Sequence, residues 1–477
     1  MAYSIAQEPN QLAAANSPMV FILKESSSAI YNGFKFRYIA QVFISTTNDS
    51  TWVEKAKIKI HKNAVNVGIV DVHKIVRTYL ETQEKNVGDQ ESIDGSIHSI
   101  GISDTSNSYS QNTSQLVGVK IVGGYEKATS ATTAPVENLT PETDAALYTR
   151  IIYSIPASTP YTKTFSDRGG LDIDGTNNPL RYYTPNNVGR FFLTNAPRVQ
   201  FVRGSSTAAD NVDELTIAFI QRGLITDSQT LGRIIVIYYQ ADGTVINTTN
   251  IDCTTGVGGQ ATADDVKNSL IYFGCGTANL ENFNTGGTNL HRPSNNANWA
   301  YYTIQGASTL DSARTMKYYF YRYGSGASGI DDRHQSCTRY DNIRLAWRNR
   351  LGSWDYMNFR GKSTESVDIT RSDMAKVPGT WDSTTFTYDN WDRGKKTLYT
   401  EATRKLSINS DWLNEDEAVW LEELFTSTNV QILADSNIVY PVIITNKTYT
   451  KKTSVNNKIK IQYTINLEYA NKVRTNS

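Results

Sequence analysis

The feature that most constrains this fold is a strict alternation of apolar and polar residues near the C-terminus, in Lys458–Glu468. An apolar side chain stands at every second position from 459 to 469, and polar side chains fill the gaps. Successive side chains of a strand point to opposite faces of its sheet, so the pattern predicts one buried and one solvated face. Such strands are typical of antiparallel sheets that are covered on one side only.

A helix is predicted upstream of this strand. Asn414 and Glu417 have the spacing of a capping box, and acidic residues fill the first turn, where the helix dipole favours negative charge. Strands are expected after the helix, at Val430–Leu433 and Ile438–Ile444. Residues 397–477 are therefore predicted to form a small α+β module, a helix on an antiparallel meander. The apolar stripe of the helix has helical spacing and comprises Ala418, Trp420, Leu421, Leu424 and Phe425.

Composition narrows the class of protein. Lysine plus arginine and aspartate plus glutamate each number 47 in the 477 residues, so the formal net charge is zero. General nucleic-acid-binding proteins usually carry a basic excess, so no specific nucleic-acid partner is expected. The chain has 28 tyrosines and 31 glycines beside abundant Thr, Ser and Asn. This composition is typical of a mainly β protein with long polar loops.

Cysteine usage and apolar runs indicate the compartment. Cys253, Cys275 and Cys337 lack metal-ligand spacing and cannot all pair, which favours reduced thiols. Residues 1–16 lack the basic region and apolar core of a secretory signal. The longest apolar run, Ile234–Tyr239, is too short to cross a bilayer. We therefore expect synthesis in a cytoplasm, no membrane partner and no cofactor.

Residues 1–125 are predicted to form an N-terminal β domain that begins with a polar arm. Apolar and polar residues alternate through Phe34–Ile44, which predicts its longest strand. Shorter strands are expected at Met19–Leu23 and Ala56–Ile60, followed by a short helix that Asp71 caps.

A long polar loop, residues 81–114, belongs to this domain and shows no periodicity. Its few apolar residues bury too little surface to offset the entropy of ordering the backbone. We expect the loop to be mobile in the isolated subunit and to order against a neighbouring subunit. Ile97, Ile100 and Ile102 are its expected anchors.

Residues 126–145 are predicted to be a polar connector, residues 146–372 a second β domain and residues 373–396 an irregular linker. Short strands recur in the second domain at the spacing of a β-sandwich or jelly roll. Asp242-Gly243 is a hairpin signal, and Asn349–Ser353 is a second bend. The fold class is therefore mainly β, with tandem β-sandwich or jelly-roll-like domains. The expected strands are Leu147–Ser154, Arg190–Leu193, Val199–Arg203, Leu215–Gln221, Gly232–Tyr239, Thr244–Asn247, Asn268–Phe273, Trp299–Ile304, Met316–Tyr323, Asn342–Trp347, Trp354–Phe359 and Val367–Thr370.

Two glycine-containing motifs resemble nucleotide-binding loops. Gly324–Gly329 has the G-x-G-x-x-G spacing and follows a predicted strand, but no helical stripe follows it to meet a pyrophosphate. Gly361-Lys362-Ser363 resembles the end of a phosphate-binding loop, but Tyr356 stands where that loop requires glycine. Both motifs are interpreted as ordinary loops.

Other candidate chemistry is equally weak. Asp172–Gly175 lacks the third acidic position and the distal glutamate of a calcium loop, which favours a turn over a loose calcium site. His334 and Cys337 are close in sequence, whereas catalytic Cys-His pairs are usually distant in sequence. Paired carboxylates for glycoside hydrolysis leave no short-range signature and stay open. No catalytic, cofactor-binding or metal residue is assigned, and no enzyme is predicted.

Aromatic residues cluster at Tyr301-Tyr302 and at Tyr318–Tyr323. Clusters of this kind form sheet cores, subunit interfaces or sugar-binding platforms. The sequence leaves these three alternatives open.

Three stretches of the chain carry a resemblance to a known family: Phe34–Ile44 with Gly68–Leu80, Leu345–Arg371, and Trp420–Asn471. Together they resemble virion structural proteins of tailed bacteriophages, in particular tail or neck proteins of crAss-like and related phages. The resemblance implies a ring-forming subunit of the tail, neck or baseplate. It brings no catalytic motif and therefore assigns no functional residue.

We therefore predict a structural subunit of a tailed-phage virion, synthesised in the bacterial host cytoplasm and forming a symmetric ring. Its expected partners are further copies of itself and other virion tail or neck proteins. A host-receptor or carbohydrate-binding tail protein is the alternative, because of the aromatic clusters. A polysaccharide-degrading tail enzyme is a weaker alternative.

Overall fold

A computed structural model gives the fold, and strands dominate it, so the predicted mainly β class is confirmed. The chain divides into two compact units. Unit 1 comprises Met1–His334 and Arg348–Asp355, and unit 2 comprises Gln335–Trp347 and Tyr356–Ser477. The finer domain boundaries expected from the sequence stay predictions. The structure describes residues 3–9, 12–45, 51–80, 97–99, 117–139, 149–155, 183–184, 187–188, 192–221, 233–252, 269–282, 289–307, 313–323, 340–376, 379–381, 384–387, 389–392, 394–434, 438–452 and 461–476.

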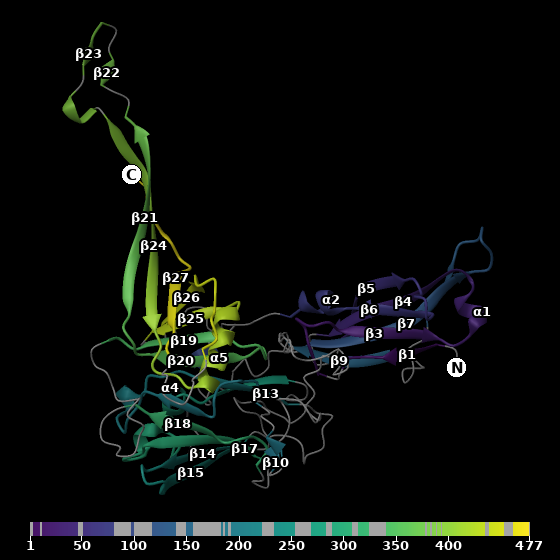
Figure 1. The fold of residues 1–477 in the computed structure, drawn as a ribbon, viewed down its shortest axis with the longest axis horizontal. Coiled ribbons are helices and arrows are strands. Elements are labelled where there is room, and N and C mark those ends of the chain that lie inside the picture. The colour runs from purple at the N-terminus through teal and green to yellow at the C-terminus, as the bar shows by residue number, and fades with distance from the viewer. Residues whose placement is uncertain are drawn as a thin grey trace. The chain divides into compact units, whose positions relative to one another are not determined.

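The first part of unit 1 is a β-sandwich (Figure 1). Side chains from both of its sheets form one core, in which Phe21 and Leu23 meet Tyr38, Val42 and Ile121. One sheet has the order β1-β3-β6, with β1 (Tyr3–Gln7), β3 (Val20–Glu25) and β6 (Val67–Asp71). The other has the order β2-β9-β7-β4-β5 with β8 on β7, and comprises β2 (Leu12–Ala14), β4 (Phe34–Ser45), β5 (Val53–Ile60), β7 (Val117–Ala128), β8 (Val136–Leu139) and β9 (Thr149–Ile155).

The central strand β4 confirms the predicted alternation from Phe36 onward, whereas Phe34 is 54% exposed. Phe36, Tyr38, Ala40, Val42 and Ile44 are all buried on one face of the strand. The Tyr38 hydroxyl is satisfied in this core, because it donates to the Asn66 carbonyl at 2.6 Å and accepts from the Glu25 amide at 3.1 Å. A short helix, α1 (Ser28–Tyr31), precedes the strand.

Three expectations for this region are wrong. The N-terminal arm is part of the sandwich, since β1 pairs with β3 and both Tyr3 and Ile5 are buried. Residues 126–145 are not simply a connector, because β7 continues to Ala128 and β8 pairs back onto it. Strand β9 pairs with β7 as well, so Thr149–Ile155 belongs to this sheet and not to the next one.

The short helix α2 (His73–Arg77) follows β6, but Asp71 is not its N-cap. Val72 occupies the cap position, and Asp71 is the last residue of β6. The Asp71 carboxylate instead accepts hydrogen bonds from the amides of Met19, at 2.9 Å, and His73, at 3.1 Å. It thereby ties the start of the helix to β3.

The expected loop 81–114 is described only at η2 (Ile97–Ser99), and there the prediction is wrong. Ile97 and His98 are buried within unit 1, so Ile97 is not available as an anchor for a neighbouring subunit. The His98 carbonyl accepts from the Asn279 amide group at 2.8 Å, and the Ser99 hydroxyl donates to Glu214 at 2.7 Å. Ile100 and Ile102 lie outside the described residues.

The second part of unit 1 packs a five-stranded sheet against a strand pair. Phe192 contacts both layers, with ring centroids 6.1 Å from Phe219 and 5.7 Å from Tyr318. The larger sheet has the order β12-β18-β17-β14-β15, with β12 (Val199–Val202), β14 (Arg233–Tyr239), β15 (Val245–Asp252), β17 (Tyr301–Ala307) and β18 (Tyr318–Arg322). The pair is β13 (Thr216–Gln221) with β16 (Ser269–Gly274). This part also holds β10 (Tyr183–Thr184), β11 (Asn187–Val188), α4 (Thr277–Asn282) and the 3-10 helices η6 (Ala208–Asp210) and η8 (Pro293–Asn295).

Most strands predicted for this region are confirmed, with two differences. Phe192 and Leu193 are not in a strand, so the expected strand Arg190–Leu193 is wrong where it is described. β12 runs parallel to β18, although the other pairs of this sheet are antiparallel.

Both predicted bends are confirmed, and each uses a glycine in the left-handed region. Gly243 joins β14 to β15 with φ +86°, and Gly352 has φ +85° in the bend after β19. L-residues with a side chain rarely adopt these angles, so glycine is required at both positions.

Unit 2 is built on an eight-stranded sheet with the order β20-β19-β25-β26-β27-β24-β21, and β28 pairs with β24. The strands β25, β26 and β27 are antiparallel neighbours, which confirms the predicted meander. The strands are β19 (Ile343–Arg348), β20 (Trp354–Phe359), β21 (Thr364–Ala375), β24 (Lys395–Asn409), β25 (Val430–Ala434), β26 (Ile438–Ile444), β27 (Thr464–Tyr469) and β28 (Val473–Asn476).

The predicted helix is confirmed as α5 (Glu415–Thr426), and so is its capping box. The Asn414 carboxamide oxygen accepts from the Glu417 amide at 2.7 Å, and the Asn414 amide donates to the Glu417 carboxylate at 2.8 Å. Ala418, Leu421 and Leu424 are buried. The helix packs on the sheet through large side chains, since the Trp420 ring lies 4.9 Å from the Trp347 ring of β19 between centroids.

Two corrections concern the strands of unit 2. Among the described residues, the last predicted strand begins at Thr464, because Ile461 forms only an isolated bridge with Leu413. Lys458–Lys460 lie outside the described residues. The linker 373–396 is not irregular throughout, since β21 extends to Ala375 and β24 begins at Lys395. Between them lies a small pair, β22 (Thr380–Trp381) with β23 (Phe386–Thr387).

Candidate functional site

The candidate functional surface of unit 2 is a long ribbon formed by β21, β24 and β28, with the β22–β23 pair at its far end (Figure 1). Thr364 pairs with Ser407 at its base, and Ala375 pairs with Lys395 toward its tip. Every residue of β21 except Ser372 is exposed to solvent. Exposed apolar side chains on a strand of this length indicate a surface that binds a partner.

The two faces of the ribbon differ in chemistry. Residues paired directly across strands have side chains on the same face. Ile369 pairs with Ala402, and Ala402 pairs with Val473, which gives an apolar row across three strands. Ile369 is 50% exposed and Val473 57% exposed, and Val367 on the same face is 48% exposed.

The opposite face is polar and carries an ion pair between Lys405 and Asp368. This pair raises the pKa of Lys405, chiefly through the hydrogen bond from its ammonium group to Asp368. Near the tip, Trp391 is 70% exposed. The ribbon thus has one face with an apolar row, flanked by Glu365, Arg371 and Arg404, and one polar face.

The β21 strand ends the sheet among the described residues, so one of its two edges has no paired strand there. An edge strand presents backbone N–H and C=O groups to any further strand. Natural proteins often shorten or bend such edges, whereas β21 keeps twelve residues with one bulge, between Ser372 and Asp373.

A second candidate surface lies on the five-stranded sheet of unit 1. Alternation divides the predicted tyrosine clusters between the two faces of this sheet. Tyr302, Tyr318 and Phe320 are buried and belong to the core. Tyr301 and Tyr321 are half-buried on the other face.

The half-buried aromatic residues form a continuous row. The register places Tyr239 beside Tyr301, Tyr301 beside Tyr321, and Tyr321 beside Phe201. The Tyr239 and Tyr301 rings stack with centroids 4.7 Å apart and an interplanar angle of 8°, and the Tyr301 and Tyr321 rings stack at 4.8 Å and 26°. Burial, followed by the adjacent Tyr321 and Tyr239, raises the pKa of Tyr301 and favours its neutral hydroxyl.

This stacking limits what the row can bind. A sugar ring packs on the face of an aromatic ring, but here the inner ring faces already contact one another. The row therefore presents ring edges and hydroxyl groups, which suit hydrogen bonding to a protein or a polar ligand. The core interpretation holds for one face of the sheet, and the interface and sugar interpretations both apply to the other.

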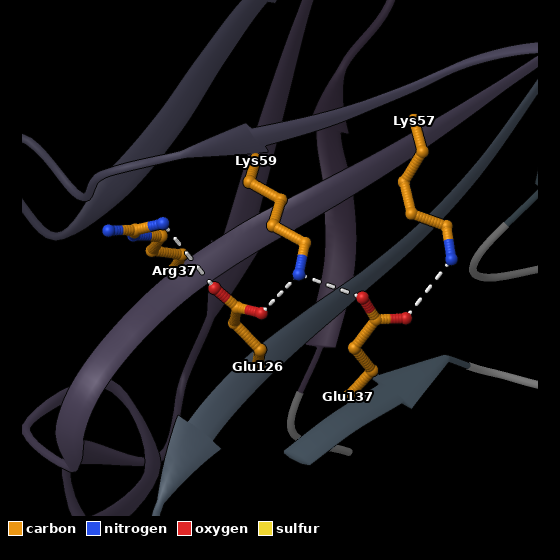
Figure 2. Close-up of polar contacts among 5 residues, drawn as sticks. All are labelled: Arg37, Lys57, Lys59, Glu126 and Glu137. Carbon is orange, nitrogen blue, oxygen red and sulfur yellow. Dashed lines mark hydrogen bonds and ion pairs between the residues drawn. The ribbon is translucent and has the colours of Figure 1, made fainter. Parts of the chain in front are cut away.

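A charged cluster spans four strands of the N-terminal sandwich (Figure 2). Lys59 from β5 contacts Glu126 of β7 at 2.6 Å and Glu137 of β8 at 2.8 Å. Lys57 contacts Glu137 at 3.1 Å, and Arg37 lies 3.8 Å from Glu126. The Glu126 side chain is only 3% exposed, so the surrounding cations compensate a buried carboxylate.

The geometry of this cluster bears on the enzyme alternative. A glycosidase needs one protonated carboxyl group as a general acid, and its pKa must be raised. The hydrogen bonds from Lys59 and then Lys57 lower the pKa of Glu137, which is the opposite shift. We therefore interpret Glu126 and Glu137 as ties between β5, β7 and β8.

The structure describes one of the four candidate motifs found in the sequence. Gly324–Gly329, Asp172–Gly175 and the His334 and Cys337 pair lie outside the described residues. Gly361 is described, and a Cβ atom there would meet the Asn409 carbonyl oxygen at 2.6 Å. Packing against β24 therefore explains the glycine of this motif without a phosphate.

Cys275 is buried and not in a disulfide, as predicted, whereas Cys253 and Cys337 are outside the described residues. In the part of the chain that the structure describes, no group of three or more His, Cys, Asp and Glu side chains is arranged to hold a metal ion. No described helix combines the length and the apolar character needed to cross a membrane.

Sequence reasoning missed the ribbon. It predicted only Val367–Thr370 as a strand and placed no strand at Lys395–Asn409. Neither strand has the continuous apolar face on which the predictions depended. The available signal was the repeated Thr, Val and Ile content of these segments, which favours extended backbone without predicting burial.

Comparisons with known proteins give only distant structural likeness. No protein family and no curated protein matches the chain. A crystal structure of a Salmonella alpha-2-macroglobulin point mutant is similar with 8% identity and a TM-score of 0.18, over 100% of this chain and 31% of that one. Salmonella alpha-2-macroglobulin reacted with methylamine gives 9% identity and a TM-score of 0.16, over 97% of this chain and 22% of that one. The chain thus spans less than a third of these proteins, and likeness this slight carries no functional argument.

Proposed function

We propose that the chain is a non-enzymatic structural subunit of a tailed-phage virion, which assembles into a ring of the tail, neck or baseplate. It would be made in the bacterial host cytoplasm and work in the virion, in contact with copies of itself and with other tail or neck proteins. The sequence resemblance supplies the class of particle. The physical support comes from the surface of unit 2.

The observation that carries the proposal is the ribbon of β21, β24 and β28. A subunit that works alone gains nothing from an extended strand with apolar side chains such as Ile369 and Val473 in water. An assembly subunit gains burial of these side chains against its neighbours.

The test is the assembly state of the purified full-length chain. We expect defined oligomers by light scattering and rings of uniform diameter by electron microscopy. A variant with Ile369→Lys and Val473→Lys should lose them, because both charges fall on the apolar face. Thr370→Lys is the matched control on the polar face and should retain them. A wild-type chain that is monomeric at all concentrations would falsify the proposal.

Carbohydrate recognition is the second candidate function, and the aromatic row of unit 1 favours it. Ring edges and hydroxyl groups at Tyr239, Tyr301 and Tyr321 can hydrogen-bond to sugar hydroxyls. A glycan array with the wild-type chain and with Tyr301→Phe tests this function. Binding that the substitution weakens supports it, and no binding to any glycan removes it. The polysaccharide-degrading enzyme remains the weaker alternative.

A further inference from the structure

The exposed edge strand β21 carries a self-complementary pattern of side chains. Glu365, Val367, Ile369 and Arg371 occupy alternate positions, share one face and are all exposed. Their order is acidic, apolar, apolar, basic. When the strand is reversed, the order becomes basic, apolar, apolar, acidic, so each residue meets its complement in a second copy.

We propose that β21 pairs antiparallel with β21 of a second copy of this chain, about a twofold axis at Asp368. In this register Val367 lies opposite Ile369 of the second copy, and Glu365 lies opposite Arg371 of the second copy. Each contact occurs twice, as in every isologous interface. The pairing adds a strand to the exposed sheet edge through backbone hydrogen bonds, and the side chains fix the register.

Neighbouring registers lose this complementarity. An axis at Val367 places Glu365 opposite Ile369, and an axis at Ile369 places Val367 opposite Arg371. Both put a charged group against an apolar one. The axis at Asp368 alone among these three matches charges with charges and apolar groups with apolar groups.

The apolar patch formed by the pairing continues into each subunit. Ile369 is followed across the ribbon by Ala402 and Val473. When two copies pair, their rows of Ile369, Ala402 and Val473 therefore meet, with the two Val367 side chains between them. Burial of half-exposed Val and Ile side chains contributes roughly 25 cal/mol for each Å² removed from water.

The opposite face brings the two copies of Asp368 together at the axis. Like charges directly opposite in a sheet are destabilising. Here each Asp368 already forms an ion pair with Lys405 of its own chain. The two ammonium groups therefore neutralise the two carboxylates at the centre of the interface.

This inference rests on the proposed function and deepens it by naming a surface through which copies join. An isologous contact joins two subunits, or two rings face to face, and does not by itself close a ring. The ring contacts and the β21 contact are therefore separable by experiment.

The first test is disulfide trapping in the full-length chain. Directly opposed residues of antiparallel strands have Cα atoms about 4.5–5.5 Å apart, within the range of a disulfide. Asp368→Cys should therefore give a covalent dimer on a non-reducing gel. Asp373→Cys on the same strand is the control, since its two copies would lie on the order of 30 Å apart in this register. The wild-type chain gives the background from its own cysteines.

The second test exchanges charges. Arg371→Glu places two glutamates opposite each other and should weaken dimerisation about tenfold in sedimentation experiments. Adding Glu365→Arg restores opposite charges and should restore most of the affinity. Arg371→Glu is the cleaner single change, because Glu365 lies 3.9 Å from Arg404 of its own chain.

The results of these experiments distinguish a failure of the β21 pairing from a failure of the proposed function. Defined assemblies that Arg371→Glu leaves unchanged, with no specific cross-link at Asp368→Cys, overturn the pairing and leave the proposed function standing. Trapped dimers without larger assemblies support the pairing and overturn the ring. A chain that is monomeric throughout overturns both.

Discussion

Strands β4 and β21 have the same length, twelve residues, and very different surroundings. β4 pairs with β5 on one side and β7 on the other, and its alternate apolar residues from Phe36 to Ile44 are buried in a sandwich. β21 pairs with β24 alone, and its apolar residues face solvent. The difference shows that a long antiparallel ladder fixes the backbone, whereas the regularity of the apolar alternation decides which strand is buried.

The largest effect is expected from a matched pair of substitutions in these two strands. Ile44 is 2% exposed and Ile369 is 50% exposed. Ile44→Ala should lower the free energy of unfolding by about 2–5 kcal/mol, because it removes buried methyl groups and leaves a cavity. Ile369→Ala should change it by less than about 0.5 kcal/mol. Urea unfolding at a concentration where the chain is monomeric measures both, and equal losses would show that β21 is packed in the free subunit.

The next effect tests how closely the sandwich is packed. A Cβ atom on Gly123 of β7 would lie 1.9 Å from the Tyr3 hydroxyl oxygen. Gly123→Ala should therefore cost about 1–3 kcal/mol through overpacking. The cost should fall in a Tyr3→Ala background, and a double-mutant cycle reports the coupling between the two residues. If the cost is the same in both backgrounds, the steric contact is not its cause.

The comparison also explains how much of the fold the sequence predicts. The alternation through Phe34–Ile44 and the capping box at Asn414 with Glu417 are local patterns with one physical meaning. The capping box is confirmed, and the alternation is confirmed from Phe36 onward. The arm at Tyr3 and Ile5 was missed because a short strand carries too few residues to show alternation. Its burial depends on pairing with β3, which no local pattern reports.

The candidate surfaces were harder to predict, for different reasons. The ribbon has only a short apolar row on one face, flanked by charged residues, so Lys395–Asn409 gives no burial signal despite its length. The aromatic row was visible as a cluster, but its division into core and surface depends on the register of Tyr301 with Tyr239 and Tyr321. The Glu126 cluster joins residues far apart in sequence, and contacts of this kind produce no regular residue spacing in the sequence.

A smaller loss of stability is expected from substitutions at the N-cap of α5, the helix of unit 2. Asn414→Ala removes the N-cap of α5 and should cost about 1 kcal/mol, within a range of about 0.5–2 kcal/mol. Asn414→Asp keeps an acceptor for the Glu417 amide and should cost much less. Thermal unfolding checks both variants. A loss equal to that of Asn414→Ala would show that the hydrogen bond from the Glu417 amide does not stabilise the helix.

The smallest change in stability is expected from removing one ion pair in each region. The pairs are Glu137 with Lys59 on the sandwich and Asp368 with Lys405 on the ribbon. The ammonium groups of Lys59 and Lys57 lower the pKa of Glu137, so its stabilisation is present above the unfolded pKa of about 4.3 and is lost as the pH falls through the folded pKa. The pKa of its partner, Lys59, shifts in the opposite direction. Hydrogen bonds to Glu126 and then Glu137 raise this pKa, so the stabilisation from Lys59 is complete below about pH 10.4 and is lost at higher pH.

Glu137→Gln should therefore lower the melting temperature at pH 7, and this effect should disappear as the pH falls through the lowered folded pKa of Glu137. Glu54→Gln, at an exposed glutamate of β5, is the control. Asp368→Asn should have less effect at pH 7, because the Asp368 side chain is 60% exposed, against 32% for Glu137. Salt screens exposed charges more effectively than partly buried ones, so 1 M salt should remove the effect of Asp368→Asn and retain part of that of Glu137→Gln. The opposite ranking would mean that the ribbon is the less solvated region, and the contrast between β4 and β21 would not hold in solution.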